Sequence, residues 1–454
     1  MNNRSIYIYL SITLLSIVTH VESVSAQREY SVEECVEMAI SNNEKIIRGE
    51  IDIEASQQRV REAYTHYFPS VEATASGFKA NSGLIDTSVD LEGVIPAEVA
   101  AMLPADLAPL LAYMPSSVPV SMLESGVVAG VTAMVPIYAG REIVNSNRLA
   151  KVGHEVAKVQ QAMNHNEVTL AVYGYYAGIV NLREKLVTLE FVEEMLKTLH
   201  RDVEAAVKAG LTTRNDLLRV ELQQNKVKSD RSRLENGIRL CNMQLAQYIG
   251  ADMTTFGIVM PRENFQMPKL PASREVTEAV MSRDEVTLLD HSVEAATLQR
   301  RITLANNMPK VGVGAGYLYN NLLGESSTTG LIFGTISVPI SKWWGGSHVV
   351  KRSRLMEEKA IKERDNAIEM LTLQTRQVWD ELTEAHTQIE IAEKSIESAT
   401  ENLRMTQSAY EAGTVKMSEL LEAQMLLQQS HNQYSDSRCT YAVKEINYRQ
   451  IVGL

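Results

Sequence analysis

Residues 135–137, Val-Pro-Ile, recur 203 positions later as residues 338–340, and this repetition decides the fold. Residues 209–210, Ala-Gly, recur at the same offset as residues 412–413. Matches that keep one spacing over so long a stretch indicate that the segments between them are equivalent elements. An internal repeat of this kind determines architecture before any local pattern is considered.

Further upstream the offset is different. Pro69 corresponds to Pro309, so the spacing shrinks by 37 residues, from 240 to 203, between Pro69 and Pro136. The first copy therefore carries an insertion, which we place at residues 82–123. The predicted organisation is repeat 1 at residues 27–250, a linker at 251–272 and repeat 2 at 273–454.

Residues 1–26 have the layout of an export signal. Arg4 precedes an apolar stretch over residues 5–18, and residues 24–26, Val-Ser-Ala, offer a cleavage site. This 14-residue stretch would span about 21 Å as a helix, less than the roughly 30 Å hydrocarbon core of a bilayer. We expect a cleaved signal peptide; an uncleaved membrane anchor is the alternative reading of the same features.

The composition argues against several classes of function. A net charge of −12 disfavours a nucleic-acid partner, because such partners favour a basic patch. The three cysteines form neither a disulfide framework nor a metal-binding spacing, and the nine histidines include no HExxH motif. We therefore expect no enzymatic activity, no cofactor, no metal ion and no nucleic acid.

The distribution of proline separates helical from non-helical stretches. No proline occurs between Pro136 and Pro261 or after Pro339. Within these stretches apolar residues step by four and three, as from Leu182 to Leu186 and Leu189, which is typical of coiled coils. The predicted helices are 31–67, 141–208 and 214–248 in the first copy, and 273–307, 344–411 and 417–451 in the second.

Between the helices the apolar period changes to two. Alternating small or polar and apolar residues predict four strands, at about 69–80, 126–137, 309–320 and 330–341. Their length and alternation are typical of transmembrane β-strands, and a soluble β-sandwich is the alternative. Aromatic residues flank these strands, as a belt at a membrane interface would: Tyr64, Tyr67, Phe68, Tyr138, Trp343 and Trp344.

Four strands cannot close a membrane barrel, since the smallest need about eight. An open sheet edge in lipid would leave backbone groups unpaired, at several kcal/mol for each group. A chain that spans a membrane in this way must therefore oligomerise through its strand edges. The predicted fold class is an α+β membrane protein with two structural repeats, in which four strands per chain join a shared barrel and long helices form a coiled coil.

The order helix, strand, strand, long helix, glycine-marked turn and helix, repeated twice, resembles the TolC-type outer-membrane efflux proteins. The most specific segments are residues 135–140, Val-Pro-Ile-Tyr-Ala-Gly, and the two turns with their flanks, 209–218 and 412–421. The resemblance implies a homotrimer with one β-barrel in outer-membrane lipid and a helical tunnel in the periplasm. It further implies a passive channel that receives cargo from an inner-membrane pump and a periplasmic adaptor, a membrane fusion protein.

The resemblance also assigns the two glycine-marked turns to the periplasmic tip, where they would dock the adaptor. Small residues at the tip of a helical hairpin let another hairpin approach closely. Gly210 and Gly413 also fit ordinary helix C-caps, and the two roles are compatible. The predicted docking residues are Ala209, Gly210, Leu211, Ala412, Gly413 and Thr414.

Four further residues match positions at the family's closed tunnel entrance. Glu419 and Glu422 match acidic positions that line the pore, where rings of carboxylates would attract cations. Asp216 and Tyr410 match positions whose cross-helix hydrogen bonds hold the entrance shut. The chain departs from the family at Val415, where a basic residue is common, and the acidic pair also fits a solvated helix face.

Two questions stay open at this level. The insertion at residues 82–123 is acidic and rich in proline, and it fits either a simple external loop or a plug or partner-docking element. A structural or adhesive coiled-coil protein of the cell envelope is the alternative function. Within the channel class, efflux of drugs, metals or small molecules is not distinguished from type I secretion of proteins.

Overall fold

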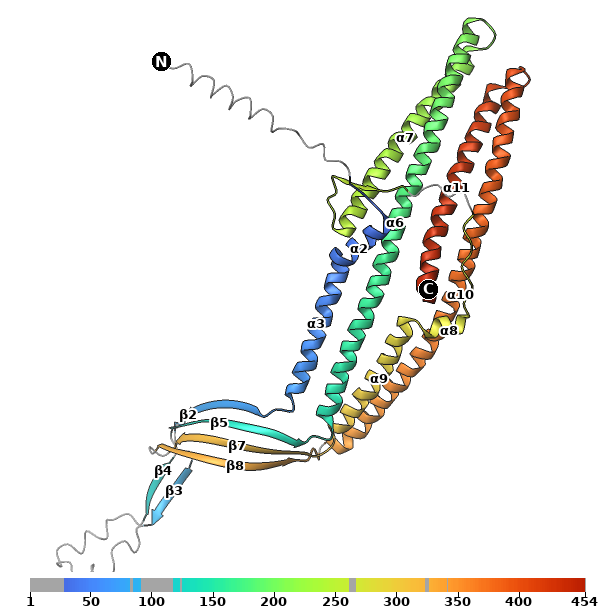
Figure 1. Cartoon of the computed structure of the whole chain (residues 1–454). Coiled ribbons are helices and arrows are strands. Elements are labelled where there is room, and N and C mark those ends of the chain that lie inside the picture. Colours follow the sequence, from blue (N-terminus) through green and yellow to red (C-terminus); the bar gives the residue numbers. More distant parts are fainter. Residues whose placement is uncertain are drawn as a thin grey trace, which may run out of the picture. The chain divides into compact units, whose positions relative to one another are not determined.

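The computed structural model describes residues 28–81, 85–90, 117–122, 125–260, 267–322, 326–340 and 342–453. The expected signal peptide and most of the insertion lie outside the described residues. The chain forms two compact units. A mainly helical unit comprises Met1–Ala55, His154–Val293 and Ile361–Leu454, and a sheet unit comprises Ser56–Gly153 and Glu294–Ala360. Figure 1 shows the elements of both units.

The sheet unit contains a four-stranded antiparallel sheet in the order β2-β5-β7-β8. These strands are β2 (Ser70–Lys79), β5 (Ser125–Tyr138), β7 (Lys310–Asn321) and β8 (Ser326–Ser337). The central pair joins the two repeats, with Ala133 of β5 opposite Ala315 of β7. Strands β2 and β8 are the outer strands, and neither has a second strand neighbour among the described residues.

Close approach of the strands depends on small residues. A Cβ atom added to Gly130 would lie 2.4 Å from Leu318 Cδ2 and 2.9 Å from the Tyr317 carbonyl oxygen. The register between β5 and β7 shifts between Pro136 and Tyr138, where proline has no N–H to donate to the ladder. Glycine and proline at these positions therefore have defined roles in the pairing.

The fourth strand differs from its predicted position. It was expected at about 330–341, whereas β8 spans Ser326–Ser337. It begins earlier because its polar first residues continue the ladder with β7, and Ser326 lies opposite Asn321. It ends before Pro339, which could not donate a backbone hydrogen bond.

Two segments expected to be irregular contain strands. Within the insertion, β3 (Ile85–Asp90) pairs with β4 (Ser117–Met122) in antiparallel orientation. Within the linker, β6 (Phe256–Ile258) pairs in parallel with β1 (Arg28–Tyr30), and the Tyr30 and Phe256 rings stack at 5.5 Å. These strands are too short to show an apolar period in the sequence. They form because each pairs with another segment that is separated from it in the chain.

The long helices form two hairpins, α6 (Glu142–Lys208) with α7 (Arg214–Ile249), and α10 (Lys342–Glu411) with α11 (Met417–Val452). Both returning helices, α7 and α11, contain 36 residues. The equal length matches the constant offset between the two copies. No helix among the described residues combines the length and the apolar character needed to cross a bilayer.

The first helix of each repeat is broken in two, which corrects the single helices predicted at 31–67 and 273–307. The first becomes α2 (Val32–Asn42) and α3 (Glu44–Thr65), and the second becomes α8 (Val276–Met281) and α9 (Asp284–Ala305). The breaks fall at Asn43 and Arg283, which are equivalent positions of the repeat.

Different polar contacts stabilise the two breaks. The Asn43 amide donates to the Tyr248 carbonyl at 2.9 Å, and its side-chain oxygen accepts from the backbone N–H of Lys45. The Arg283 guanidinium is buried and donates to Thr375 Oγ1 at 3.2 Å and to the Glu285 carboxylate. Two of these four partners, Tyr248 and Thr375, lie on other helices, so the local sequence could not reveal these contacts.

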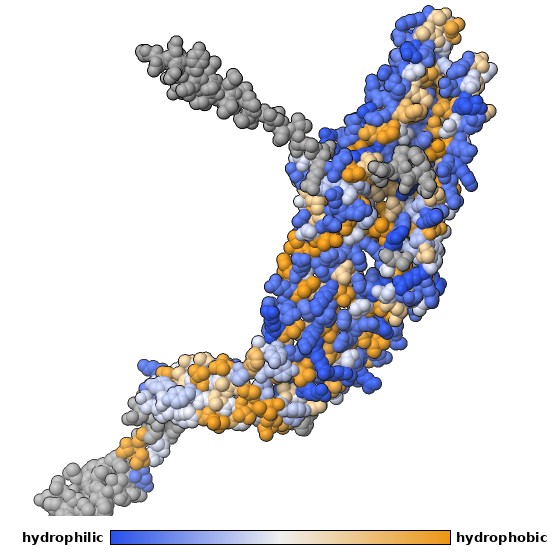
Figure 2. Space-filling model, in the orientation of Figure 1, coloured by the Kyte–Doolittle hydropathy of each residue, from blue (hydrophilic) through white to orange (hydrophobic). Residues whose placement is uncertain are grey.

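The apolar side chains of the sheet are exposed, unlike those of a folded core. Figure 2 shows apolar residues gathered over the strands, whereas hydrophilic residues cover much of the visible helical surface. Ile332 and Ile336 of β8 are 85% and 74% exposed. The single chain therefore leaves uncovered a surface that a soluble protein would bury.

We predict that Gly130→Val lowers the unfolding midpoint of the purified protein. The added side chain must displace Leu318 and the Tyr317 carbonyl, and overpacking of this kind costs about 1–3 kcal/mol. Gly334→Val is the matched control, because a Cβ at Gly334 meets nothing within 4 Å. Equal midpoints for the two variants in a thermal unfolding measurement would contradict the close strand approach.

Candidate functional site

The two glycine-marked turns are built in the same way. Gly210 and Gly413 both have φ of +73°, a left-handed conformation that glycine adopts without strain. In the first turn the Leu211 N–H donates to the Ala206 carbonyl, and in the second the Thr414 N–H donates to the Ala409 carbonyl, each at 2.9 Å. These bonds satisfy the last carbonyls of α6 and α10.

The six residues predicted to dock an adaptor are exposed at these turns. Ala209, Gly210 and Leu211 form the first turn, and the Leu211 side chain is 81% exposed. Ala412, Gly413 and Thr414 form the second turn and are exposed as well. No heavy atom lies within 4 Å of where a Cβ would stand on either glycine, so both turns present open, small surfaces.

Asp216 closes a capping box at the start of α7. Its carboxylate accepts from Thr212 Oγ1 at 2.8 Å and from Thr213 Oγ1 at 2.7 Å, and the Asp216 N–H donates to Thr213 Oγ1 at 3.4 Å. Partial burial would raise the pKa of Asp216, but the hydrogen bonds from Thr213 and Thr212 outweigh it and lower the pKa. The residue is therefore ionised and held within its own turn.

Glu419 is the counterpart of Asp216 in the second repeat. The offset of 203 relates the two residues, and the Lys416 N–H donates to Glu419 Oε1 at 3.5 Å at the start of α11. The lysine side chain has no acceptor atom, so this second cap lacks the hydroxyl that Thr213 provides. Two of the predicted gate residues therefore occupy the same structural position, one in each repeat.

The predicted gate residues lie on the hairpin ends without forming the expected bonds in one chain. Burial raises the pKa of the Tyr410 hydroxyl, and the Asp216 charge raises it further. The Asp216 carboxylate accepts its hydrogen bonds from Thr212 and Thr213 instead. Glu419 and Glu422 are exposed, and Val415 is half-buried.

An apolar cluster joins the two hairpins just inside the turns. Val203 of α6, Val220 of α7 and Met417 of α11 are buried together, and Tyr410 of α10 packs against them. Beside this cluster lies a cavity of about 370 Å³, lined by residues of α6, α10 and α11 that include Tyr410. The cluster fixes both turns on one rigid support.

Arg231 is a structural residue whose role the sequence alone did not show. It interrupts the apolar seam of α7, which predicts a wet face. The Arg231 side chain is 37% exposed, and its guanidinium bridges Glu193 at 2.9 Å and Glu190 at 3.1 Å on α6, and Glu235 at 2.9 Å on its own helix. The sequence feature that could have predicted this role is the acidic pair Glu190 and Glu193 on the facing helix α6.

The predicted interface aromatics lie in the sheet unit, near the ends of the strands. Tyr64 packs against Tyr67 and Phe68 with ring centroids 5.5 and 5.6 Å apart. These three residues, Tyr138 and Trp344 are all exposed, and Trp344 reaches 74%. Trp343 lies in the first turn of α10, and its side chain lies outside the described part of the structure.

Within the described residues, no group of three or more His, Cys, Asp or Glu side chains could hold a metal ion. The three cysteines are free; Cys35 is buried, while Cys241 and Cys439 are half-buried. Burial raises the pKa of the Cys35 thiol to about 12, with Glu34 and Glu33 adding to the shift, so this thiol stays protonated.

Comparison with known proteins places this architecture in a family. Residues 277–454 match the family model described as outer membrane efflux protein. Over 338 residues the chain is 20% identical to outer membrane protein TolC of Vibrio cholerae. The aligned region covers 72% of this chain and 76% of that protein. The second repeat therefore matches the outer membrane efflux proteins, and the chain as a whole is similar to members of the TolC type.

A second curated relative and several solved structures agree with this assignment. The chain is 21% identical to the alkaline protease secretion protein AprF of Pseudomonas aeruginosa, over 54% of this chain and 53% of AprF. The crystal structure of CusC is similar with a TM-score of 0.75 at 14% identity, covering 93% of this chain and 92% of that one. The open-state MtrE channel of Neisseria gonorrhoeae has a TM-score of 0.70 at 15% identity, covering 96% and 93%.

The similar proteins indicate where in the cell this protein acts. It is an outer-membrane channel protein whose long helices form a periplasmic tunnel. Its relatives are channels and not enzymes. The residues at the turns and at the helix starts are therefore candidates for docking and gating.

We predict that Thr213→Ala loosens the start of α7. Loss of a threonine N-cap costs about 1 kcal/mol, so amide exchange in residues 212–220 should accelerate about fivefold. Hydrogen–deuterium exchange with mass spectrometry measures the change. Lys416→Ala is the matched control in the second repeat and should leave exchange near residues 415–423 unchanged; equal acceleration at both turns would contradict the capping role of the hydroxyl.

Proposed function

We propose that three copies of this chain form a passive exit channel from the periplasm to the exterior. The observation that carries the proposal is the sheet β2-β5-β7-β8, whose outer strands have no second neighbour among the described residues. In a bilayer, each unpaired backbone group costs several kcal/mol. Pairing β2 of one copy with β8 of the next satisfies both edges, and a closed ring of identical subunits is the common symmetric solution.

The side chains of the sheet support this arrangement. The strand register places Val71 opposite Ala133, and Ala315 opposite Ile332, on one face. Val71 is exposed in the single chain, as Ile332 is. Residues of the neighbouring register row, such as Glu72 and Thr132, point to the other face. One apolar and one polar face suit a sheet with lipid on one side and water on the other.

The periplasmic end of the channel docks the adaptor through the two turns. Ala209, Gly210 and Leu211 form one contact surface, and Ala412, Gly413 and Thr414 form the other. Their exposure and small side chains support the proposal, since a helical hairpin of the adaptor can approach the backbone closely. The cluster of Val203, Val220 and Met417 holds the two surfaces in a fixed relation within each chain.

The entrance is gated near the same turns. Glu419 and Glu422 are exposed on α11, and three copies would place two rings of carboxylates around the pore. Asp216 and Tyr410 act as the latch between neighbouring helices in the assembled channel. Export of cargo draws its energy from the inner-membrane pump, which therefore also chooses between small molecules, metals and proteins.

Reconstitution in planar bilayers tests the channel and its selectivity together. Purified protein should conduct, and Glu419→Gln combined with Glu422→Gln should lower the cation-to-anion permeability ratio. One unit charge at 4 Å in water is worth about 1 kcal/mol, so the expected fall is up to about fivefold. Glu397→Gln is the control, because this exposed residue lies on α10 well away from the turn.

The outcome separates the competing functions. A structural or adhesive envelope protein would give no conductance at all, although it would share the coiled coil. If the double variant conducts with an unchanged permeability ratio, Glu419 and Glu422 do not line the pore. The proposed channel function would still hold.

We predict that Ala209→Trp and Ala412→Trp each weaken adaptor binding. A steric clash of about 1.4 kcal/mol or more at the docking surface lowers affinity at least about tenfold. The yield of adaptor chemically cross-linked to the channel in cell envelopes measures this effect. Ala205→Trp, one turn earlier on the exposed surface of α6, should keep the wild-type yield. Equal yields in all three variants would place the adaptor elsewhere.

A further inference from the structure

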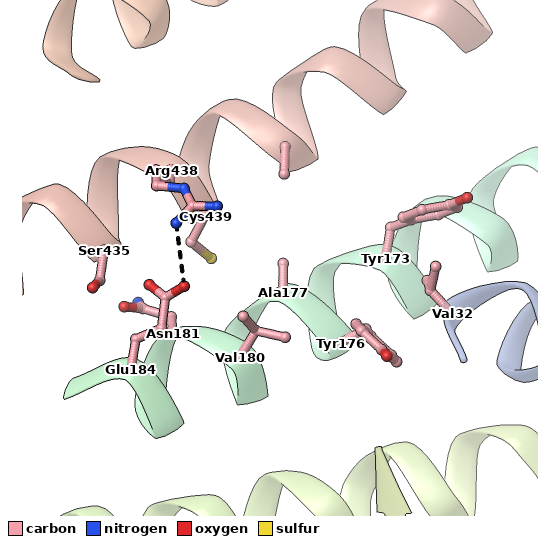
Figure 3. A pocket seen from close by; sticks show the side chains of 11 residues that line it. Val32, Tyr173, Tyr176, Ala177, Val180, Asn181, Glu184, Ser435, Arg438 and Cys439 are labelled. Atoms are coloured by element: carbon pink, nitrogen blue, oxygen red, sulfur yellow. Dashed lines mark ion pairs between the residues drawn. The ribbon is translucent and has the colours of Figure 1, made fainter. Parts of the chain in front are cut away.

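A cavity lies between α6 and α11 within the helical unit, away from the turns. It has a volume of about 190 Å³. Tyr173, Tyr176, Ala177 and Val180 of α6 form one wall, and Cys439 of α11 lies opposite them. Figure 3 shows the aromatic side chains at one end of the cavity and the polar side chains at the other. The cavity therefore has two chemically distinct ends.

The polar end contains an acceptor without a partner. The Asn181 side chain donates from Nδ2 to Asp436 at 2.8 Å, while its Oδ1 atom is buried and has no hydrogen-bond partner. The neighbouring charges are already paired, since Arg438 lies 3.5 Å from Glu184 (Figure 3). A buried carbonyl oxygen without a partner costs free energy, which a ligand with an N–H or O–H donor would recover.

The aromatic end sets the size and character of the rest of the ligand. An apolar cavity of about 150 Å³ is enough to hold benzene. The rings of Tyr173 and Tyr176 offer stacking or edge contacts, and Cys439 Sγ, which lies toward the polar end in Figure 3, offers a favourable sulfur contact to the other edge of a bound ring. Burial raises the pKa of the Cys439 thiol, with Asp436 adding to the shift, so the thiol is neutral and suits an uncharged ligand.

We propose that this cavity binds a single-ring aromatic molecule that carries one hydrogen-bond donor, such as a phenol. The ring lies between Tyr173, Tyr176 and Cys439, and its hydroxyl donates to Asn181 Oδ1. The site lies inside one chain, on the wall of the helical unit, and is separate from both the adaptor-docking turns and the gate. It does not depend on the proposed passage of cargo through the channel.

Fluorine NMR with 4-fluorophenol tests the site in the full-length protein reconstituted in lipid nanodiscs. The wild type should show saturable binding beyond partition into lipid. Ala177→Leu fills the cavity and should weaken binding about tenfold or more. Ala162→Leu, on an exposed position of the same helix, is the matched control and should bind as the wild type does. Cys439→Leu provides a second cavity-filling variant if Ala177→Leu does not assemble.

Fluorobenzene tests the role of the acceptor. The wild type should prefer 4-fluorophenol by about tenfold, the usual scale for one buried hydrogen bond to an otherwise unpaired group. Asn181→Leu should abolish this preference. Absence of saturable binding in the wild type, or unchanged binding in both cavity-filling variants, would overturn the proposal. A preference that survives in Asn181→Leu would overturn the assignment of the donor to Asn181 and with it the ligand class.

Discussion

The rest of the structure depends on the apolar seam that packs the two long hairpins together. Leu189, Val192 and Leu196 of α6 are buried against Val227 of α7, and the cluster around Val203 ties α6 and α7 to α11. A seam with coiled-coil spacing buries a narrow stripe on each helix and leaves the remaining faces to water or to other subunits. The hairpins can therefore be long without forming a compact core.

The seam also explains why the two copies keep one length from the second strand onward. Both hairpins need the same length if their two turns are to build one end of the helical unit. Gly210 and Gly413 end α6 and α10 with the same left-handed cap, and α7 and α11 return over 36 residues each. The insertion that distinguishes the copies lies instead between β2 and β5, where the length of the chain is not constrained by the seam.

Polar residues break or bridge the long helices at places where apolar packing alone would give regular helices. Asn43 and Arg283 occupy equivalent positions and break the first helix of each repeat, one through an amide and the other through a buried guanidinium. Arg231 bridges α6 and α7 through three glutamates. In the cavity between α6 and α11, Asn181 Nδ2 donates to Asp436 while Oδ1 has no partner. This part of the cavity wall can therefore accept a hydrogen bond from a ligand.

The sequence by itself determined the repeat, the long helices, the strands and the positions of both turns, because periodicity, proline and glycine act within a few residues. The strand pairs β1–β6 and β3–β4 form between segments that are separated in the chain, so no local sequence pattern predicted them. Asp216 is the contrasting case, because its carboxylate is held by Thr212 and Thr213 within its own cap, which is a local contact. Only the tertiary structure decided which polar groups find partners, because burial and hydrogen bonding are set by neighbours from other elements.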